Sequence, residues 1–274
     1  MGIARELGGI VREARRHRAA PPVKGLVLEV GGGQAPHPRS DVVVDKYVVD
    51  DFERSGEAGL ALTRPLIVAD GECLPFANAA FAYSIASHVL EHATDPAVFA
   101  AELTRVSQAG FVQVPSRSSE LVYGWPYHPW LISKQDRTLL FEPKPQAASP
   151  GGAIMHEAWR SSSLMRIAWM ADRSRWHHSL HWEGTLDVAV SGTRRFHETA
   201  DIDLERTIAT LESMGSSGEL PPLGAGVRDV LRCPRCGSEI SWAERKVTCH
   251  EAGHDYPVAG GVPILLTPAT GDGS

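Results

Sequence analysis

The stretch from Val27 to Pro36 constrains the fold most, because a short apolar run leads directly into a glycine-rich turn. Residues 27–30 indicate a buried strand, and the triplet Gly31-Gly32-Gly33 follows at once. A glycine turn at the carboxyl end of the first strand of an α/β sheet lets the backbone approach a bound nucleotide or nucleoside. Glu29 stands two residues before the glycines, so we expect its carboxylate to face the same crevice.

The pattern of an apolar run with a polar end recurs along the first half of the chain. Asp95 and Pro96 then open a helix that is expected to extend to about Val106, with Asp95 as its N-cap. Strands that alternate with helical stretches predict parallel βαβ units, and therefore a doubly wound, Rossmann-like α/β sheet. Ligands of such sheets bind at the carboxyl ends of the strands. The further strands are expected at Asp41–Asp45, Leu66–Asp70, Phe81–Ser87 and Phe111–Pro115, and the residues at the ends of the strands are Glu29, Gly31, Gly33, Asp45, Asp70 and His88.

Length and charge limit the classes of protein to consider. The 274 residues, 43% hydrophobic and 22% charged, suit one α/β domain with a small appendage. Residues 1–24 are expected to form an amphipathic helix of net charge +4, which leaves −10 for the rest of the chain. An acidic body makes nucleic-acid binding an unlikely general role. No apolar run reaches the about 18 residues of a membrane span, and charges interrupt any signal-peptide core, so a cytoplasmic location is the default expectation.

Two further blocks carry a resemblance to a known family. Asp70-Gly71-Glu72-Cys73-Leu74-Pro75-Phe76 precedes His88-Val89-Leu90-Glu91-His92. Together with the glycine turn, in this order and at this spacing, they resemble class I S-adenosylmethionine-dependent methyltransferases. The similar branch has Asp-Gly/Ala-Glu-x-Leu-Pro-Phe followed by His-Val-Leu-Glu-His, and the resemblance covers roughly residues 25–115.

The resemblance implies a methyltransferase acting on a small-molecule or peptide acceptor, and it implies a role for each matching residue. Glu29, Gly31 and Gly33 would line the methionine end of the cofactor, and Asp45 would accept hydrogen bonds from the ribose hydroxyls. A carboxylate suits this role because it accepts from two donors. The adenine edge would meet Asp70, Gly71 and Glu72, and the sulfonium and acceptor would lie beside Ser87 and His88. His88 and His128 are the candidate catalytic bases.

Other interpretations of these residues stay open. A nicotinamide site is disfavoured because Pro36 interrupts the Gly-x-Gly-x-x-Gly pattern. Asp45 and Asp70 could instead cap following helices, although both end strands. The chain could also be an inactive cofactor-binding scaffold or partner subunit. RNA methylation is a further alternative, based on the basic first helix and the C-terminal module.

The region after the fifth strand is rich in aromatic residues. We expect residues 116–160 to form an aromatic lid within a methyltransferase domain of residues 25–200. The family uses this segment to shape the acceptor pocket, which makes Tyr123, Trp125 and Trp130 substrate candidates. Aromatic faces suit a planar or cationic acceptor. His177 and His181 would share a face on a helix and could bind a metal, whereas on a strand His177, Ser179 and His181 would share one.

The C-terminal part has the cysteine spacing of a metal-binding module. Residues 201–225 predict a helix and a linker, and residues 226–270 a small β-rich domain. Cys233-Pro-Arg-Cys236 is a zinc-knuckle spacing, with Cys249, His250 and His254 as the partner half. With the tail from Tyr256 to Leu266, it resembles the small zinc-ribbon activator subunit of RNA and translation-factor methyltransferases. Ala252 stands where that family has its fourth cysteine, so the expected zinc ligands are Cys233, Cys236, Cys249 and His254, with His250 as the alternative.

Overall fold

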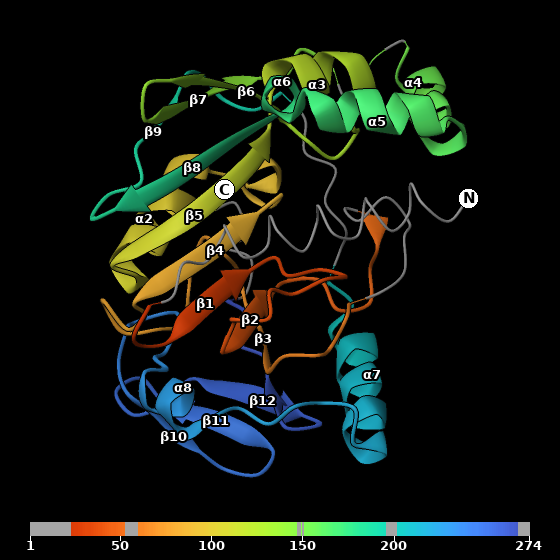
Figure 1. The fold of residues 1–274 in the computed structure, drawn as a ribbon. Coiled ribbons are helices and arrows are strands. Elements are labelled where there is room, and N and C mark those ends of the chain that lie inside the picture. Colours follow the sequence, from red (N-terminus) through yellow and green to blue (C-terminus); the bar gives the residue numbers. More distant parts are fainter. Residues whose placement is uncertain (1–22, 53–59, 147–148, 150, 196–201, 268–274) are drawn as a thin grey trace.

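The computed structural model describes residues 23–52, 60–146, 149, 151–195 and 202–267. At its centre is a six-stranded sheet of order β3-β2-β1-β4-β5-β8 (Figure 1). Its first five strands are parallel, and β8 is antiparallel to β5 at the edge. The strands are β1 (Val27–Val30), β2 (Val42–Asp45), β3 (Leu66–Val68), β4 (Tyr83–Ser87), β5 (Ala109–Pro115) and β8 (His177–Glu183). The α/β fold and its parallel strands are confirmed, whereas the amphipathic helix expected within residues 1–24 lies outside the described residues apart from residues 23 and 24.

Two connections of the sheet lack a crossover helix. Residues 31–41, between β1 and β2, contain only turns and bends, and so do residues 69–82 before β4 apart from isolated bridges. Pro36 and Pro38 remove backbone donors from the first of these connections, which disfavours a helix there. The predicted helix α2 (Pro96–Val106) is present between β4 and β5, after the short 3₁₀ helix η2 (Leu90–His92). The Asp95 side chain accepts from the N–H groups of residues 97 and 98 and so caps α2.

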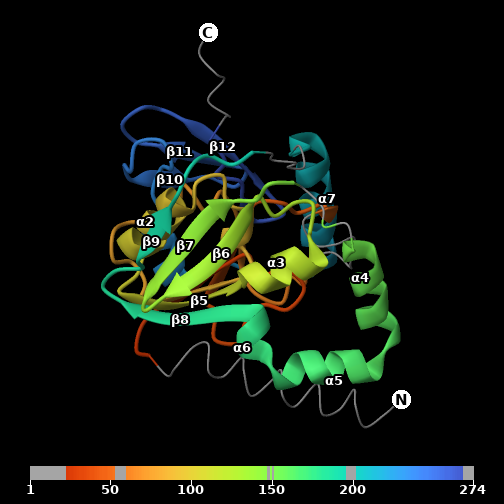
Figure 2. The ribbon, with the colours of Figure 1, turned by 90° about the horizontal axis from the view of Figure 1, so that it is seen from above.

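A second group of elements covers the β8 side of the sheet. Strands β6 (Trp130–Gln135) and β7 (Thr138–Pro143) form a hairpin, and β9 (Val188–Val190) pairs parallel to β7. Helices of the described residues also lie at this end of the molecule, and Figure 2 shows them to one side of the hairpin. They are α3 (Arg117–Tyr123), α4 (Gly152–Ser161), α5 (Ser163–Ala171) and α6 (Arg173–Trp176).

The C-terminal part forms its own small sheet at the opposite, β3 end (Figure 1). Helix α7 (Leu204–Ser217) begins at the N-cap Asp203 and ends at Gly218, whose φ of 75° suits a glycine. The short helix α8 (Ala225–Asp229) leads into four antiparallel strands of order β10-β11-β12-β13. These are β10 (Ile240–Trp242), β11 (Lys246–Cys249), β12 (Asp255–Ala259) and β13 (Val262–Pro263).

The core of this C-terminal unit is continuous with the core of the main sheet. Leu231, Val247 and Tyr256 belong to the same buried cluster as Leu28 and Val44 of the parallel strands. On the other face, α7 and β13 pack against β2 and β3, through Leu211, Val262, Val43, Leu66 and Val68. The unit therefore covers the β2–β3 part of the sheet, where crossover helices are missing from the connections 31–41 and 69–82.

Backbone hydrogen bonds also join the two parts. The N–H of Leu265 donates to the carbonyl of Val68 at 2.7 Å, so residues 264–265 continue the sheet beyond β3. Phe76 and Leu231 form an antiparallel bridge, and Arg232 N–H donates to the carbonyl of Pro75 at 2.9 Å. Among the described residues, no helix combines the length and apolar character needed to cross a bilayer.

Candidate active site

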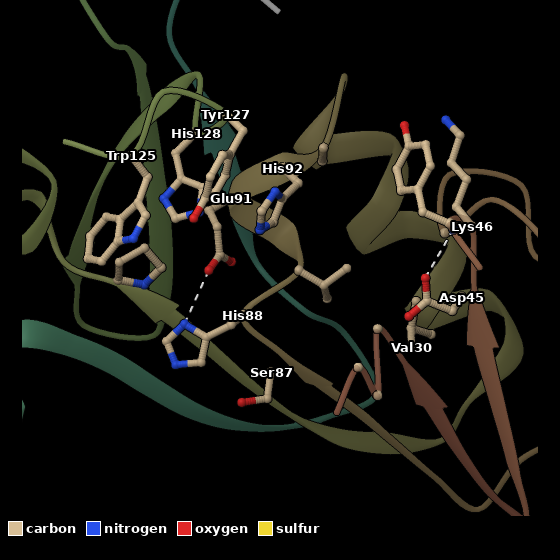
Figure 3. A pocket seen from close by; sticks show the side chains of 18 of the residues that line it. Val30, Asp45, Lys46, Ser87, His88, Glu91, His92, Trp125, Tyr127 and His128 are labelled. Carbon is tan, nitrogen blue, oxygen red and sulfur yellow. Dashed lines mark hydrogen bonds and ion pairs between the residues drawn. The ribbon is translucent and has the colours of Figure 1, made fainter. Parts of the chain in front are cut away.

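A cavity of about 880 Å³ opens at the carboxyl ends of β1, β2, β3 and β4. Figure 3 shows Asp45 and Lys46 on one side of it, and the histidine and aromatic side chains on the other. Most of the residues predicted from the sequence line this one cavity, which is the convergence expected of strand ends in a parallel sheet. They are Gly31, Gly33, Asp45, Asp70, Gly71, Glu72, Ser87, His88, Tyr123, Trp125 and His128.

The glycine turn brings backbone to the cavity wall. Gly31 has a φ of +70°, and a Cβ there would lie 2.8 Å from the side chain of Val89. Its N–H donates to the carbonyl of Val44 at 2.8 Å, which ties the turn to the end of β2. Gly33, with a φ of +53°, also has a conformation that residues with side chains rarely adopt.

Glu29 and Trp130 were expected at the site but lie outside the cavity lining. The buried Glu29 carboxylate accepts from the His37 N–H at 2.7 Å and from the Ser40 hydroxyl at 2.6 Å. It therefore holds the helix-free connection 31–41 in place. Trp130 is 2% exposed and donates its Nε1–H to the carbonyl of Ala93 at 2.8 Å, so its ring belongs to the core.

The acidic side chains at the strand ends differ in their partners. Asp45 accepts from the Tyr47 N–H at 3.1 Å, and Asp70 forms an ion pair with Lys46 at 2.8 Å. Glu72 accepts from the N–H groups of residues 94 and 95, at 2.5 and 3.2 Å, before the start of α2. Burial, and then the charge of Asp70, raises the pKa of Glu72. Lys46, which the sequence did not single out, thus compensates the charge at the β3 end of the cavity.

Replacing Gly71 by alanine is expected to destabilise the protein and to weaken ligand binding. An ideal Cβ at residue 71 would lie 2.2 Å from Cε2 of Phe99, a buried ring of α2. Such overpacking costs about 1–3 kcal/mol of unfolding free energy and shifts the neighbouring Asp70 and Glu72. Thermal unfolding measures the loss. Gly226→Ala is the control, because its Cβ meets only ordinary contacts, and an equal melting temperature for the two variants would contradict the prediction.

His88 lies at the centre of a hydrogen-bonded network. Its backbone has a φ of +58°, which is strained for a histidine and is typical of functional sites. Nδ1 lies 3.2 Å from Oε1 of Glu91, and Nε2 lies 3.2 Å from Oε1 of Gln113. Arg173 donates to the same Gln113 oxygen at 2.8 Å, and the Gln113 amide donates to Ser179 at 2.7 Å. The His88 ring is thus held between the Glu91 carboxylate and the Gln113 side chain.

His128 has a different environment. The ring is buried, and its Nδ1 bonds to the carboxylate of Glu120, which also forms an ion pair with Lys144 at 2.8 Å. Burial lowers the pKa of His128, although Glu120 acts in the opposite direction. Glu91 lies beside His128, and its burial acts to raise its pKa. The hydrogen bond and charge of His88, together with the charges of His128 and His92, outweigh burial and lower the pKa of Glu91.

Aromatic rings form the wall opposite the strand ends. Trp125 stacks on Tyr123 at 5.4 Å and lies 5.2 Å from His128, as ring-centre distances. Tyr127 stacks on His92 with an angle of 8° between the ring planes. The sequence did not identify the cavity-lining residues that α4 and α5 contribute. The amphipathic pattern of these two segments was the only available signal. The cavity-lining residues missed in this region are Tyr127, His156, Trp159, Arg160 and Trp169.

The histidines at residues 177 and 181 do not form a metal site. They lie on the strand β8, and residues four apart on a strand are separated by about 13 Å. The His177 ring packs edge-on against His88 at 4.8 Å, whereas His181 bonds through Nδ1 to the Tyr83 hydroxyl at 2.9 Å. His177 thus lines the cavity, and His181 does not.

The C-terminal cysteines converge with one histidine. Ligand atoms of Cys233, Cys236, Cys249 and His254 all lie within 4.8 Å of one another. The N–H of Ala252 donates to Cys249 Sγ, and this bond, more than any other contact, lowers the pKa of Cys249 to about 7. Three thiolates and one imidazole are a donor set that suits tetrahedral zinc. The fourth donor in this group is His254 and not His250.

Comparison with known proteins supports a methyltransferase domain. A family described as "Methyltransferase domain" matches residues 39–112, whereas a search of curated proteins gave no match. Similar solved structures include S-adenosylmethionine-dependent methyltransferases from Mesorhizobium loti (14% identity, 65% of this chain, 99% of that chain, TM-score 0.35) and Aquifex aeolicus (12%, 62%, 87%, 0.31). A Bacillus halodurans protein provisionally described as a methyltransferase is 21% identical over 37% of this chain, with a TM-score of 0.28. The chain spans about half of that protein and of a Bacillus subtilis protein, 49% and 48% of their lengths.

Proposed function

We propose that this chain is an S-adenosylmethionine-dependent methyltransferase that acts on a small-molecule or peptide acceptor. One observation carries the proposal: the glycine turn, Asp45, Asp70 and His88, from the ends of neighbouring parallel strands, line a single cavity. Its volume of about 880 Å³ lies in the range of small-molecule and cofactor sites, which is about 300–1,000 Å³.

The strand-end half of the cavity fits the cofactor. Gly31 and Gly33 let the chain approach the methionine part, because any Cβ at Gly31 would meet Val89. Asp45 would accept from the ribose hydroxyls, and Asp70, paired with Lys46, would lie beside the adenine with Gly71 and Glu72. Ser87 and His88, at the end of β4, would border the reactive centre.

The aromatic half would hold and align the acceptor. The cofactor supplies a methyl group already activated on a sulfonium, so alignment is the chief requirement on the protein. Tyr123, Trp125 and Tyr127 offer flat faces to a planar or cationic group. Of the two candidate bases, His128 is the better placed, since Glu120 fixes its Nδ1 and burial favours its neutral form. Both nitrogens of His88 are instead engaged, by Glu91 and by Gln113.

Calorimetric titration of the purified full-length protein with S-adenosylhomocysteine tests the proposal. We expect a dissociation constant in the micromolar range, as is usual for a preformed nucleoside site. Absence of binding at about 1 mM ligand, where affinity would be worth only about 4 kcal/mol, would overturn it. Tight binding without methyl transfer to any acceptor would instead favour a scaffold role.

The cysteine cluster at the C-terminal unit is proposed to hold a structural zinc ion. Its removal by a chelator is expected to lower the melting temperature by roughly 10 °C, because a ligand at 1,000 times its dissociation constant adds about 4 kcal/mol of stability. Differential scanning fluorimetry with and without chelator, and metal content by mass spectrometry, measure the effect. Cys73→Ser is the control variant, since Cys73 lies outside the cluster and a hydroxyl keeps its bond to the Pro234 carbonyl. Its melting temperature should fall on chelation as that of the wild type does. An unchanged melting temperature after complete metal removal would contradict the prediction.

A further inference from the structure

Three potential metal ligands meet in the aromatic half of the cavity. Ligand atoms of Glu91, His92 and His128 lie within 4.8 Å of one another. Glu91 and His92 come from η2, and His128 from the loop that precedes β6, so distant parts of the chain bring them together (Figure 3). One carboxylate and two imidazoles are a donor set that first-row transition metals bind, often with positions left open.

The carboxylate of Glu91 provides an independent observation. Its side chain is fully buried and lines the cavity, and Oε1 is engaged by His88 at 3.2 Å. The second oxygen, Oε2, is buried without any hydrogen-bond partner in the described structure. Leaving a buried carboxylate oxygen unpaired is costly, and a bound cation removes this cost.

His128 is oriented as metal-binding histidines usually are. Its Nδ1 is held by Glu120, which leaves Nε2 as the nitrogen available to a ligand. A carboxylate on the far nitrogen fixes the ring and makes the imidazole a better donor. Lys144 completes this outer layer, because it pairs with Glu120 at 2.8 Å and donates to the Trp125 carbonyl at 2.7 Å. The charge of Glu120 is thereby compensated without help from the cluster.

We propose that Glu91, His92 and His128 bind a divalent first-row transition ion of the zinc or iron class, with open positions facing the acceptor. Glu91 supplies Oε2 and His128 supplies Nε2. Ligands about 2.1 Å from one ion are roughly 3–4 Å apart, a separation that small side-chain rotations reach. An oxygen or nitrogen of the acceptor would occupy an open position, where the ion favours its deprotonated form and the proton passes to solvent water. His128 would then be a ligand and not the base. The role toward the acceptor rests on the proposed function; the binding of the ion does not.

Cobalt(II) titration of the full-length protein, stripped of metal by a chelator, tests this site. Cobalt bound by the C-terminal thiolates gives a sulfur-to-metal charge-transfer band, and cobalt bound by nitrogen and oxygen gives only weaker d–d bands. We expect the wild type to show both signals. Glu91→Gln and His92→Phe should keep the thiolate signal and weaken the other binding by more than about 100-fold, since even outer-layer losses cost 10–100-fold. The phenylalanine preserves the ring stacked on Tyr127, which protects the fold.

Two controls make the outcome decisive. His156→Phe changes a histidine of the same cavity outside the cluster, and it should retain both signals. Cys236→Ser should weaken the thiolate signal and leave the other signal unchanged. A wild type with only the thiolate signal, or a Glu91→Gln variant with unweakened binding, would overturn the proposal. S-adenosylhomocysteine titrated into the same samples separates the two claims, because cofactor binding without the second ion leaves the methyltransferase proposal intact.

Discussion

Replacing Asp45 by alanine is expected to raise the dissociation constant for S-adenosylhomocysteine by about 100-fold. Asp45 ends β2 and lines the cavity, where it would accept hydrogen bonds from the two ribose hydroxyls. A hydrogen bond to a charged group contributes about 1.5–3 kcal/mol, so the loss of two amounts to about 3 kcal/mol or more. At about 1.4 kcal/mol for each factor of ten, this gives the expected weakening. Isothermal titration calorimetry measures it.

Two further variants identify the cause of the loss. Asp45→Asn keeps one acceptor oxygen but loses the charge, so its affinity should fall between those of the wild type and the alanine variant. Asp187→Ala removes an exposed carboxylate outside the cavity and should bind like the wild type. If Asp45→Ala bound within threefold of the wild type while its melting temperature was unchanged, the nucleoside would not contact Asp45, and the orientation proposed for the cofactor would be wrong.

The strand-end residues could be predicted because the relevant information is local in the sequence. A buried parallel strand is a short apolar run, and the residue that follows it must lie at the carboxyl edge of the sheet. Asp45, Asp70 and His88 were placed in this way, and the structure lines one cavity with all three. Glu29 has the same sequence context but points to the connection 31–41, because Ser40 and the His37 N–H take up its carboxylate.

The aromatic half of the cavity could be predicted only in part, because its residues come from separate segments. Trp125 and His128 were found since they belong to one aromatic loop. Nothing local indicates that Glu120 holds His128, or that Glu91 and His92 meet them, because these contacts depend on how α3 and η2 pack. Trp130 illustrates the opposite error: it belongs to the same aromatic stretch, but strand β6 directs its ring into the core.

The packing of the C-terminal unit against the main sheet could not be predicted from the sequence either. The cysteine spacing indicates a small metal-binding module, and such modules often fold as separate domains. The structure joins the two cores instead, because the connections 31–41 and 69–82 have no crossover helix to cover this part of the sheet and the C-terminal unit packs there. Cys73 donates to the Pro234 carbonyl at 2.9 Å and so connects the segment after Glu72 to the cysteine turn.

A chain that ends at residue 200 is accordingly expected not to fold cooperatively. Truncation would uncover Val43, Leu66 and Val68, which share a buried cluster with Leu211 and Val262, and it would remove the bridge between Phe76 and Leu231. Each such side chain contributes about 1.5–3 kcal/mol when buried, and their sum is comparable to the 5–15 kcal/mol that stabilises a typical domain. Thermal unfolding followed by circular dichroism should show no sigmoidal transition, and S-adenosylhomocysteine should not bind.

A point substitution and a shorter truncation distinguish one shared core from two domains that fold independently. Leu231→Ala, at a residue 1% exposed that bridges to Phe76, should cost 2–5 kcal/mol and lower the single melting transition of the whole protein. A chain that ends at Thr267 retains the whole described C-terminal unit and should melt like the full-length protein. Two outcomes would show that the sheet folds on its own. One is two separate melting transitions in Leu231→Ala, and the other is a chain ending at residue 200 that still binds S-adenosylhomocysteine with unchanged affinity. The strand end that carries Asp70 would then not depend on the bond between Val68 and Leu265.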